Sequence, residues 1–188
     1  MNNPSVDPRL VALRSGIVAF MEVRVELGDI TASAVEAVVT AANRSLAGGG
    51  GVDGAVHRAA GPRLIDALQP LRPCAPGEAV ATGAFEMNPP VRWIVHAVGP
   101  RYGVDEPAAE LLASAYRAAL LRCDEIGAAS VAFPSISTGA YGYPLLEACE
   151  LSIRTLVTAN TDVRLCVLVA FDARTERFWK RALARFQP

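Results

Sequence analysis

Two loops of the sequence combine glycine with side chains that can do chemistry. The first, residues 43–57, reads N-R-S-L-A-G-G-G-G-V-D-G-A-V-H, with four consecutive glycines at positions 48–51. Glycine tolerates positive φ and close approach of another group but loses much conformational entropy on folding, so such a run suggests a ligand held by bare amides at a helix N-terminus. Asn43 precedes the glycines and Asp53 follows them. We expect both side chains to face one bound molecule.

Asn43 and Asp53 suit a sugar and an attacking water. An ionised Asp53 can orient a water or a hydroxyl group and accept its proton. The amide of Asn43 can donate to one oxygen and accept from another, which fits the cis-diol of a ribose. Alternatively, Asp53 is a capping residue, because an acid near a helix N-terminus stabilises the helix by ~0.5–2 kcal/mol. The residue pattern leaves both interpretations open.

The second loop, residues 135–142, reads S-I-S-T-G-A-Y-G and leads into a predicted helix. Hydroxyls and free amides before a helix are typical of phosphate binding, although an ordinary Gly/Ser turn has the same composition. Two such loops at adjacent strand ends could hold a diphosphate between them. Tyr141 and Phe171 could stack on a base, and Asp29 could accept from an exocyclic amine. Phe171 fits equally as the last core residue of a strand, and Asp29 as a turn or cap acid.

Other glycine and nucleophile motifs fit the sequence poorly. Residues 49–54 satisfy G-x-G-x-x-G, but R-S-L-A separates them from the preceding strand, and Asp53 inside the motif would repel a pyrophosphate. No G-K-[ST] follows, which excludes a P-loop. No G-x-S-x-G surrounds Ser135 or Ser137, so a serine hydrolase is not expected.

The histidines and cysteines predict no metal site. The chain has only two histidines, His57 and His96, and its four cysteines show no C-x-x-C spacing, so we expect buried thiols and no bound metal. His57 lies one helical turn beyond Asp53 and could share its face, but a surface or loop-contacting role fits better. His96 lies in an apolar strand and is expected to be a hydrogen-bonded core residue.

Composition indicates one globular, soluble domain. The 188 residues are 52% hydrophobic and 20% charged, and the net charge of −1 disfavours nonspecific nucleic-acid binding. No apolar run reaches the ~20 residues of a membrane span. The first residues lack the apolar core of a signal peptide. We therefore expect a cytoplasmic protein that acts as a monomer, away from membranes.

Alternating strand and helix patterns predict an α/β sandwich with a largely parallel sheet. In such folds, ligands bind in the crevice beyond the carboxyl ends of the strands, where both glycine-bearing loops fall. Residues 1–16 read as a polar tail and residues 17–188 as a single domain. Strands are expected at 17–27, 37–42, 79–85, 93–98, 130–133 and 163–171, and helices at 52–68 (interrupted near residue 61), 106–126, 145–159 and 173–186.

Four motifs, taken together and in this order, resemble macrodomains, specifically the MacroD-type branch. They are G-D-I-T (28–31), A-A-N-R-S-L-A-G-G-G-G-V-D-G-A-V-H-R-A-A-G-P (41–62), W-I-V-H-A-V-G-P (93–100) and P-S-I-S-T-G-A-Y-G-Y-P (134–144). The likeness covers about residues 21–186. It implies a three-layer α/β/α sandwich with a central mixed, largely parallel sheet and an ADP-ribose cleft.

The resemblance also implies a role for each site residue. Asp29 would recognise the adenine amino group, Ile30 would add a backbone contact, and Phe171 would flank the adenine. Asn43, Gly51 and Asp53 would be catalytic, with Asp53 positioning or activating the attacking water. The remaining ligand-binding residues would be Gly49, Gly50 and Val52 at the distal ribose, and Ser135, Ser137, Thr138, Gly139, Ala140 and Tyr141 around the diphosphate, with Tyr141 also near the distal ribose.

Members of this branch are hydrolases that need neither metal nor cofactor. They remove mono-ADP-ribose from acidic side chains and deacetylate O-acetyl-ADP-ribose, so the expected partners are O-acetyl-ADP-ribose, ADP-ribose and ADP-ribosylated proteins. The alternative is a module that binds ADP-ribose without turnover, which would not require an acid at position 53. The sequence departs from the family pattern V-N-A-A-N at Thr40, which replaces the first Asn and shortens the reach of that side chain.

Overall fold

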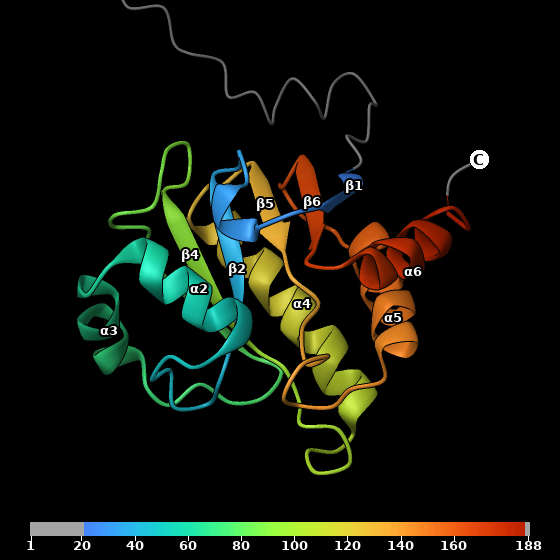
Figure 1. Cartoon of the computed structure of the whole chain (residues 1–188), viewed down its shortest axis with the longest axis horizontal. Coiled ribbons are helices and arrows are strands. Elements are labelled where there is room, and N and C mark those ends of the chain that lie inside the picture. The colour runs from blue at the N-terminus through green and yellow to red at the C-terminus, as the bar shows by residue number, and fades with distance from the viewer. Residues whose placement is uncertain (1–20, 187–188) are drawn as a thin grey trace, which may run out of the picture.

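A single sheet of six strands lies between two layers of helices in the computed structural model, which describes residues 21–186 (Figure 1). The predicted tail and residues 17–20 of the first predicted strand lie outside the described residues. The three-layer α/β/α prediction is confirmed. The strands are β1 (Glu22–Leu27), β2 (Ala37–Ala42), β3 (Ala79–Gly83), β4 (Trp93–Val98), β5 (Ser130–Phe133) and β6 (Leu165–Ala170). The helices are α2 (Gly51–Ala60), α3 (Arg63–Leu68), α4 (Ala108–Glu125), α5 (Leu145–Val157) and α6 (Ala173–Leu183), with short 3₁₀ turns η1 (Ile30–Ala32) and η2 (Gln69–Leu71).

The strand order is β1-β6-β5-β2-β4-β3. All neighbours pair in parallel except β3, which runs antiparallel to β4 at the edge. β2 lies inside the sheet between β5 and β4, and all but one of its residues are buried. Burial on both faces explains why the A-V-V-T-A-A segment shows no alternation of apolar and polar residues.

Successive strand residues point to opposite faces and form two cores. On one face, Val38 and Ile94 pack in a cluster with Val56 of α2 and Leu64 of α3. On the other face, strand residues such as Val39, Val95 and Val131 pack in a larger cluster with Leu112, Tyr116 and Trp179 of the helices α4 and α6. The four cysteines are buried and unpaired, as predicted. Each face therefore fixes one helical layer against the same sheet.

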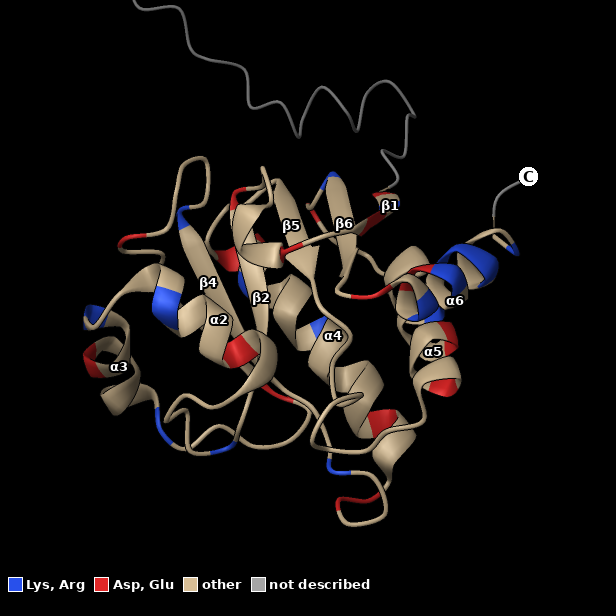
Figure 2. Cartoon of the chain, viewed as in Figure 1, with Lys and Arg blue, Asp and Glu red and all other residues tan. Residues whose placement is uncertain are grey.

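The carboxyl ends of the parallel strands meet at one edge of this sheet. β2 leads into the first glycine loop and β5, its neighbour, leads into the second. Charged residues of both signs are interspersed on loops and on the outer sides of helices (Figure 2). No helix among residues 21–186 combines the length and apolar character of a membrane span. The edge where the two loops meet is therefore the place to look for a site.

Candidate functional site

The first glycine loop ends in the N-terminus of α2. Gly50 is the N-cap and provides no side-chain hydrogen bond, and Gly51 adopts a positive φ of +58°. The N–H groups of residues 49–53 have no acceptor among the described residues, because the first donors of a helix lack partners within it. The glycine loop therefore presents N–H groups without acceptors at the start of α2, as the sequence predicted.

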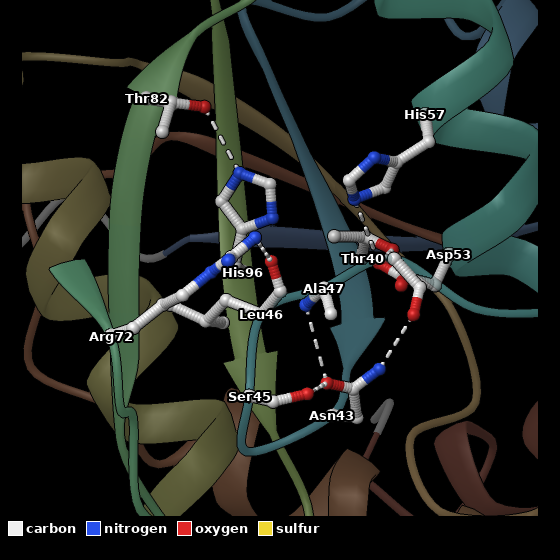
Figure 3. A network of polar contacts seen from close by, with 11 residues as sticks. Thr40, Asn43, Ser45, Leu46, Ala47, Asp53, His57, Arg72, Thr82 and His96 are labelled. Atoms are coloured by element: carbon white, nitrogen blue, oxygen red, sulfur yellow. Dashed lines mark hydrogen bonds and ion pairs between the residues drawn. The ribbon is translucent and has the colours of Figure 1, made fainter. Parts of the chain in front are cut away.

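Asp53 lies in the first turn of α2, where its charge can stabilise the helix, and its carboxylate accepts a hydrogen bond from a hydroxyl group rather than from a backbone N–H of that turn. Only 4% of the residue is exposed, and its Oδ1 accepts a hydrogen bond from Thr40 Oγ1 at 3.0 Å. Its Oδ1 also lies 3.9 Å from Nε2 of His57 (Figure 3). Burial raises the pKa of Asp53, while the Thr40 hydrogen bond and the nearby His57 lower it. A buried carboxylate with a raised pKa is a better proton acceptor than an exposed one.

Asn43 faces the same part of the loop as Asp53. Its Nδ2 donates to Gly48 O at 2.7 Å, and its Oδ1 accepts from Ser45 Oγ at 2.7 Å (Figure 3). A Cβ atom placed on Gly49 would lie 3.7 Å from both Asn43 Nδ2 and Asp53 Oδ2. The two polar side chains thus flank one glycine, and the predicted convergence of Asn43 and Asp53 is confirmed.

Close contacts explain why the loop and helix carry glycine. A Cβ on Gly54 would lie only 2.5 Å from the carbonyl oxygen of Gly49, so α2 and the loop can meet only without a side chain there. Gly48, with φ +77°, leaves its Cβ position 3.4 Å from the His57 ring. His57 therefore lies beside the loop, and a side chain at position 48 would touch its ring. The role of Gly54 was not predicted, although its place in the glycine-rich motif was a signal.

Two residues support the glycine loop, and nothing in the sequence indicated that role. Leu46 is buried and adopts a positive φ of +48°. Its carbonyl oxygen accepts a hydrogen bond from Arg72 Nη2 at 2.9 Å (Figure 3). Arg72 follows the 3₁₀ turn η2, far along the chain, so only the tertiary fold brings this support to the loop.

His96 is a buried core residue with one hydrogen bond, as predicted. Its Nε2 lies 3.0 Å from Thr82 Oγ1, whereas Nδ1 has no partner in the described structure (Figure 3). Burial lowers the pKa of His96 to about 3, so the ring is neutral.

Potential ligand atoms of Asp53, His57 and His96 all lie within 4.8 Å of one another. Two imidazoles and a carboxylate are a ligand set that zinc accepts. Sequence spacing does not indicate this cluster, because His96 lies on β4 whereas Asp53 and His57 lie on α2. The expected absence of a metal stays a prediction.

The second loop has the features of an anion site. Ser137 is buried with φ +66°, and the hydroxyls of Ser135 and Ser137 are buried without hydrogen-bond partners. The N–H groups of residues 137–141, which include Thr138, Gly139, Ala140 and Tyr141, have no acceptor among the described residues. Unpaired N–H groups in a turn before a helix are suited to phosphate oxygens.

Two residues outside this loop determine its position. Tyr116 of α4 donates from its hydroxyl to Pro134 O and accepts from Ile136 N, each at 3.2 Å. A Cβ on Gly99, just after β4, would overlap the side chains of Ser137 and Ile136. The sequence motif W-I-V-H-A-V-G-P contained Gly99, but nothing local indicated that it makes room for a distant loop.

Phe171 and Asp29 lie together at the other end of the edge. Phe171 follows β6 and is 90% exposed, so its interpretation as a core residue is wrong. Asp29 Oδ1 accepts from Thr31 N at 2.9 Å and from Thr31 Oγ1 at 2.8 Å, which confirms that it caps η1. Gly28 N donates to Ala170 O at 2.9 Å and joins the two strand ends. Beside them, Ile30 is buried. A base could stack on the free ring of Phe171.

Comparison with known proteins gives the family. The family model of the Macro domain matches residues 39–152. A "Macro domain-containing protein" from Lactiplantibacillus plantarum is 46% identical over 169 residues, which cover 87% of this chain and 97% of that protein. The chain belongs to the Macro domain family, and the resemblance noted in its motifs is confirmed.

Two further similar proteins carry names that mention a reaction or a ligand. A Salmonella gallinarum protein named O-acetyl-ADP-ribose deacetylase is 45% identical over 166 residues, covering 84% of this chain and 92% of its own. A solved structure described as an Oceanobacillus iheyensis macrodomain mutant with ADPR superimposes with a TM-score of 0.84 at 37% identity. That match covers 90% of this chain and 96% of the other.

Proposed function

We propose that this macrodomain binds ADP-ribose along the carboxyl edge of its sheet and hydrolyses esters of the distal ribose. The substrates would be O-acetyl-ADP-ribose and proteins carrying mono-ADP-ribose on Asp or Glu. The buried Asp53, held by Thr40 beside Asn43, carries this proposal. The relative named O-acetyl-ADP-ribose deacetylase supports it. A binding module would need the bare amides but not an acid next to the ribose.

The binding mode follows from the order of features along the edge. The adenine would stack on Phe171 with its amino group at Asp29, and the diphosphate would take the free amides of residues 137–141. The distal ribose would lie over residues 49–52, between Asn43 and Asp53. Gly51, with its positive φ, keeps side-chain atoms away from the ribose.

In the proposed reaction, Asp53 accepts a proton from water as the water oxygen bonds to the acyl carbon. The ester bond to the ribose oxygen then breaks, and that oxygen takes up the proton. The products are a free carboxylic acid and ADP-ribose, so atoms and protons balance. The substrate's own phosphate can assist in positioning the water. Thr40 keeps the carboxylate in place for this proton transfer.

The test compares turnover with binding. A protein auto-modified on Glu or Asp, and O-acetyl-ADP-ribose, should both be hydrolysed by the purified chain. Asp53→Ala should reduce release at least ~100-fold, as loss of a general base does, while ADP-ribose affinity changes little. Asp66→Ala, an exposed acid on α3, is the control and should keep full activity. Binding without release by the natural chain would support the reader alternative instead.

Metal independence is part of the proposal and has its own test. Turnover should be unchanged after treatment with EDTA. Loss of activity on chelation, restored by added zinc, would instead give the cluster of Asp53, His57 and His96 a catalytic metal. We also propose that the chain acts as a monomer in the cytoplasm.

A further inference from the structure

A pocket of about 520 Å³ adjoins the proposed distal-ribose site, because Asn43 and Tyr141 are among its lining residues. Along the sheet edge the strand ends follow the order β6, β5, β2 and β4. Phe171 follows β6, the phosphate-binding loop follows β5 and Asn43 follows β2. The pocket comes next: Asn43 and Tyr141 line it on one side, and Val98 and Gly99 at the end of β4 line it on the other. A group attached to the distal ribose would therefore point into it.

The pocket is too large for an acetyl group alone. Pockets that bind whole small molecules measure ~300–1,000 Å³, and this one falls within that range. Pro73 and Pro76 form part of its wall. Proline has a fixed φ and no N–H group, so this wall is stiff and donates no hydrogen bond from those positions. A pocket of this volume has room for an amino-acid side chain together with a neighbouring residue.

The side chains around the pocket carry more positive than negative charge. Arg101 donates from Nε and Nη2 to Asp105 at 2.9 and 2.8 Å, and Asp105 also accepts from Arg101 N at 2.8 Å. These two charges therefore compensate each other. Arg44 also lines the pocket and forms no ion pair among the described residues, but the hydrogen bonds from Arg101 and the charge of Arg44 both lower the pKa of the Asp105 carboxyl group. The three charged side chains that line the pocket therefore sum to one positive charge.

The backbone of Arg44 is fixed although its side chain is exposed. Its carbonyl oxygen accepts from Cys74 N at 3.0 Å, and Leu46 N donates to Asn43 O at 2.9 Å, closing a turn around it. The fold thus fixes the point from which the Arg44 side chain starts, directly after Asn43, and that side chain lines the pocket. From there its charge can reach a group held in the pocket or at its rim.

We propose that this cavity, the acyl pocket, receives the peptide part of an ADP-ribosylated substrate, and that Arg44 selects an acidic residue next to the modified Asp or Glu. This inference rests on the proposed function, because it supplies the substrate class of the same site. The preferred substrate would then be an aspartyl or glutamyl ester within an acidic peptide. O-acetyl-ADP-ribose would be a smaller substrate that leaves the pocket mostly unfilled.

The experiment measures binding separately from turnover. An Asp53→Ala chain is titrated with ADP-ribose and with two peptides ADP-ribosylated on one glutamate, one flanked by Glu and one by Ala. We expect the Glu-flanked peptide to bind about fivefold more tightly than the Ala-flanked one, the scale of a partly exposed ion pair. Adding Arg44→Ala should remove the difference, and adding Arg44→Glu should reverse it. Adding Arg164→Glu, an exposed arginine just before β6, should preserve it.

The outcomes are distinct. If the Glu-flanked and Ala-flanked peptides bind equally to the Asp53→Ala chain, Arg44 does not select the substrate. If neither peptide binds more tightly than ADP-ribose itself, the pocket does not hold the peptide part. Turnover of the same peptides by the natural chain tests the proposed function independently. If the Glu-flanked peptide is preferred in binding but neither peptide is hydrolysed, the acyl pocket stands as part of a binding module and the hydrolase proposal is overturned.

Discussion

Replacing Gly54 with alanine should abolish most turnover without unfolding the protein. The added Cβ would lie 2.5 Å from the Gly49 carbonyl oxygen, whereas ordinary contacts begin near 3.4 Å, so the loop must move by about 0.5–0.9 Å. Gly49 lies between Asn43 and Asp53. Because a misplacement of ~1 Å at a reacting centre can cost ~100-fold, we expect kcat/KM to fall by about that factor.

The same variant should lose some stability but stay folded, because the atom that must move is a backbone oxygen. Alanine is favoured over glycine inside a helix by ~1 kcal/mol, which offsets part of the strain of moving the loop. The assay is release of ADP-ribose from an auto-modified protein, with Tm measured in parallel. Gly83→Ala is the matched control, because a Cβ there meets nothing within 4 Å. Turnover within about twofold of the natural chain, in a folded Gly54→Ala variant, would refute the steric reasoning.

Three further predictions test the base, its support and the stacking ring. Thr40→Val removes the hydrogen bond that lowers the pKa of Asp53, so the acidic limb of kcat/KM should move to higher pH and the free energy of unfolding should fall by about 1–3 kcal/mol. Thr40→Ser should restore both the pH profile and the stability. An unmoved pH profile in Thr40→Val would show that the hydroxyl group does not change the pKa of the base. Burial raises the pKa of Asp53 in the folded protein, so the protein loses stability as the pH rises through that pKa and the buried group ionises. Asp53→Asn removes this cost and should therefore raise Tm more at about pH 8 than at about pH 4. An equal change in Tm at both pH values would contradict a raised pKa of Asp53 in the folded protein. Phe171→Ala should weaken ADP-ribose binding by about 1–3 kcal/mol in calorimetry, and unchanged affinity would mean that the exposed ring does not stack on the base.

Secondary structure and the two loops could be predicted because their signals are local. The segment of residues 37–42 is apolar without alternation and forms a buried strand at those bounds. Glycines 48–51 precede a helical pattern, and the helix begins at Gly51. Asn43 and Asp53 stand at the two ends of one glycine loop, so their meeting could be expected from that loop, and the parallel pairing of β2 with β5 places it beside the second loop.

The contacts that hold the two loops from elements far along the chain could not be predicted. Tyr116 looks like any buried helix residue in the sequence, yet its hydroxyl joins both sides of the turn that begins the second loop. Arg72 holds the Leu46 carbonyl from across a connector. Such contacts depend on side-chain direction and on the distance between layers, which no periodicity in one segment encodes.

The sequence by itself determined the fold class, the position of both loops and the identity of the polar residues around them. Only the tertiary structure showed which partners these residues have. Asp53 lies in the first turn of α2, and its carboxylate accepts a hydrogen bond from Thr40 of β2. Phe171 is free because β6 ends one residue before it, beyond the reach of both helical layers. His57 and His96 meet beside Asp53 because α2 lies over the face of the sheet toward which His96 points. Local pattern identifies a residue's chemistry, whereas its partners depend on packing between elements far apart in the chain.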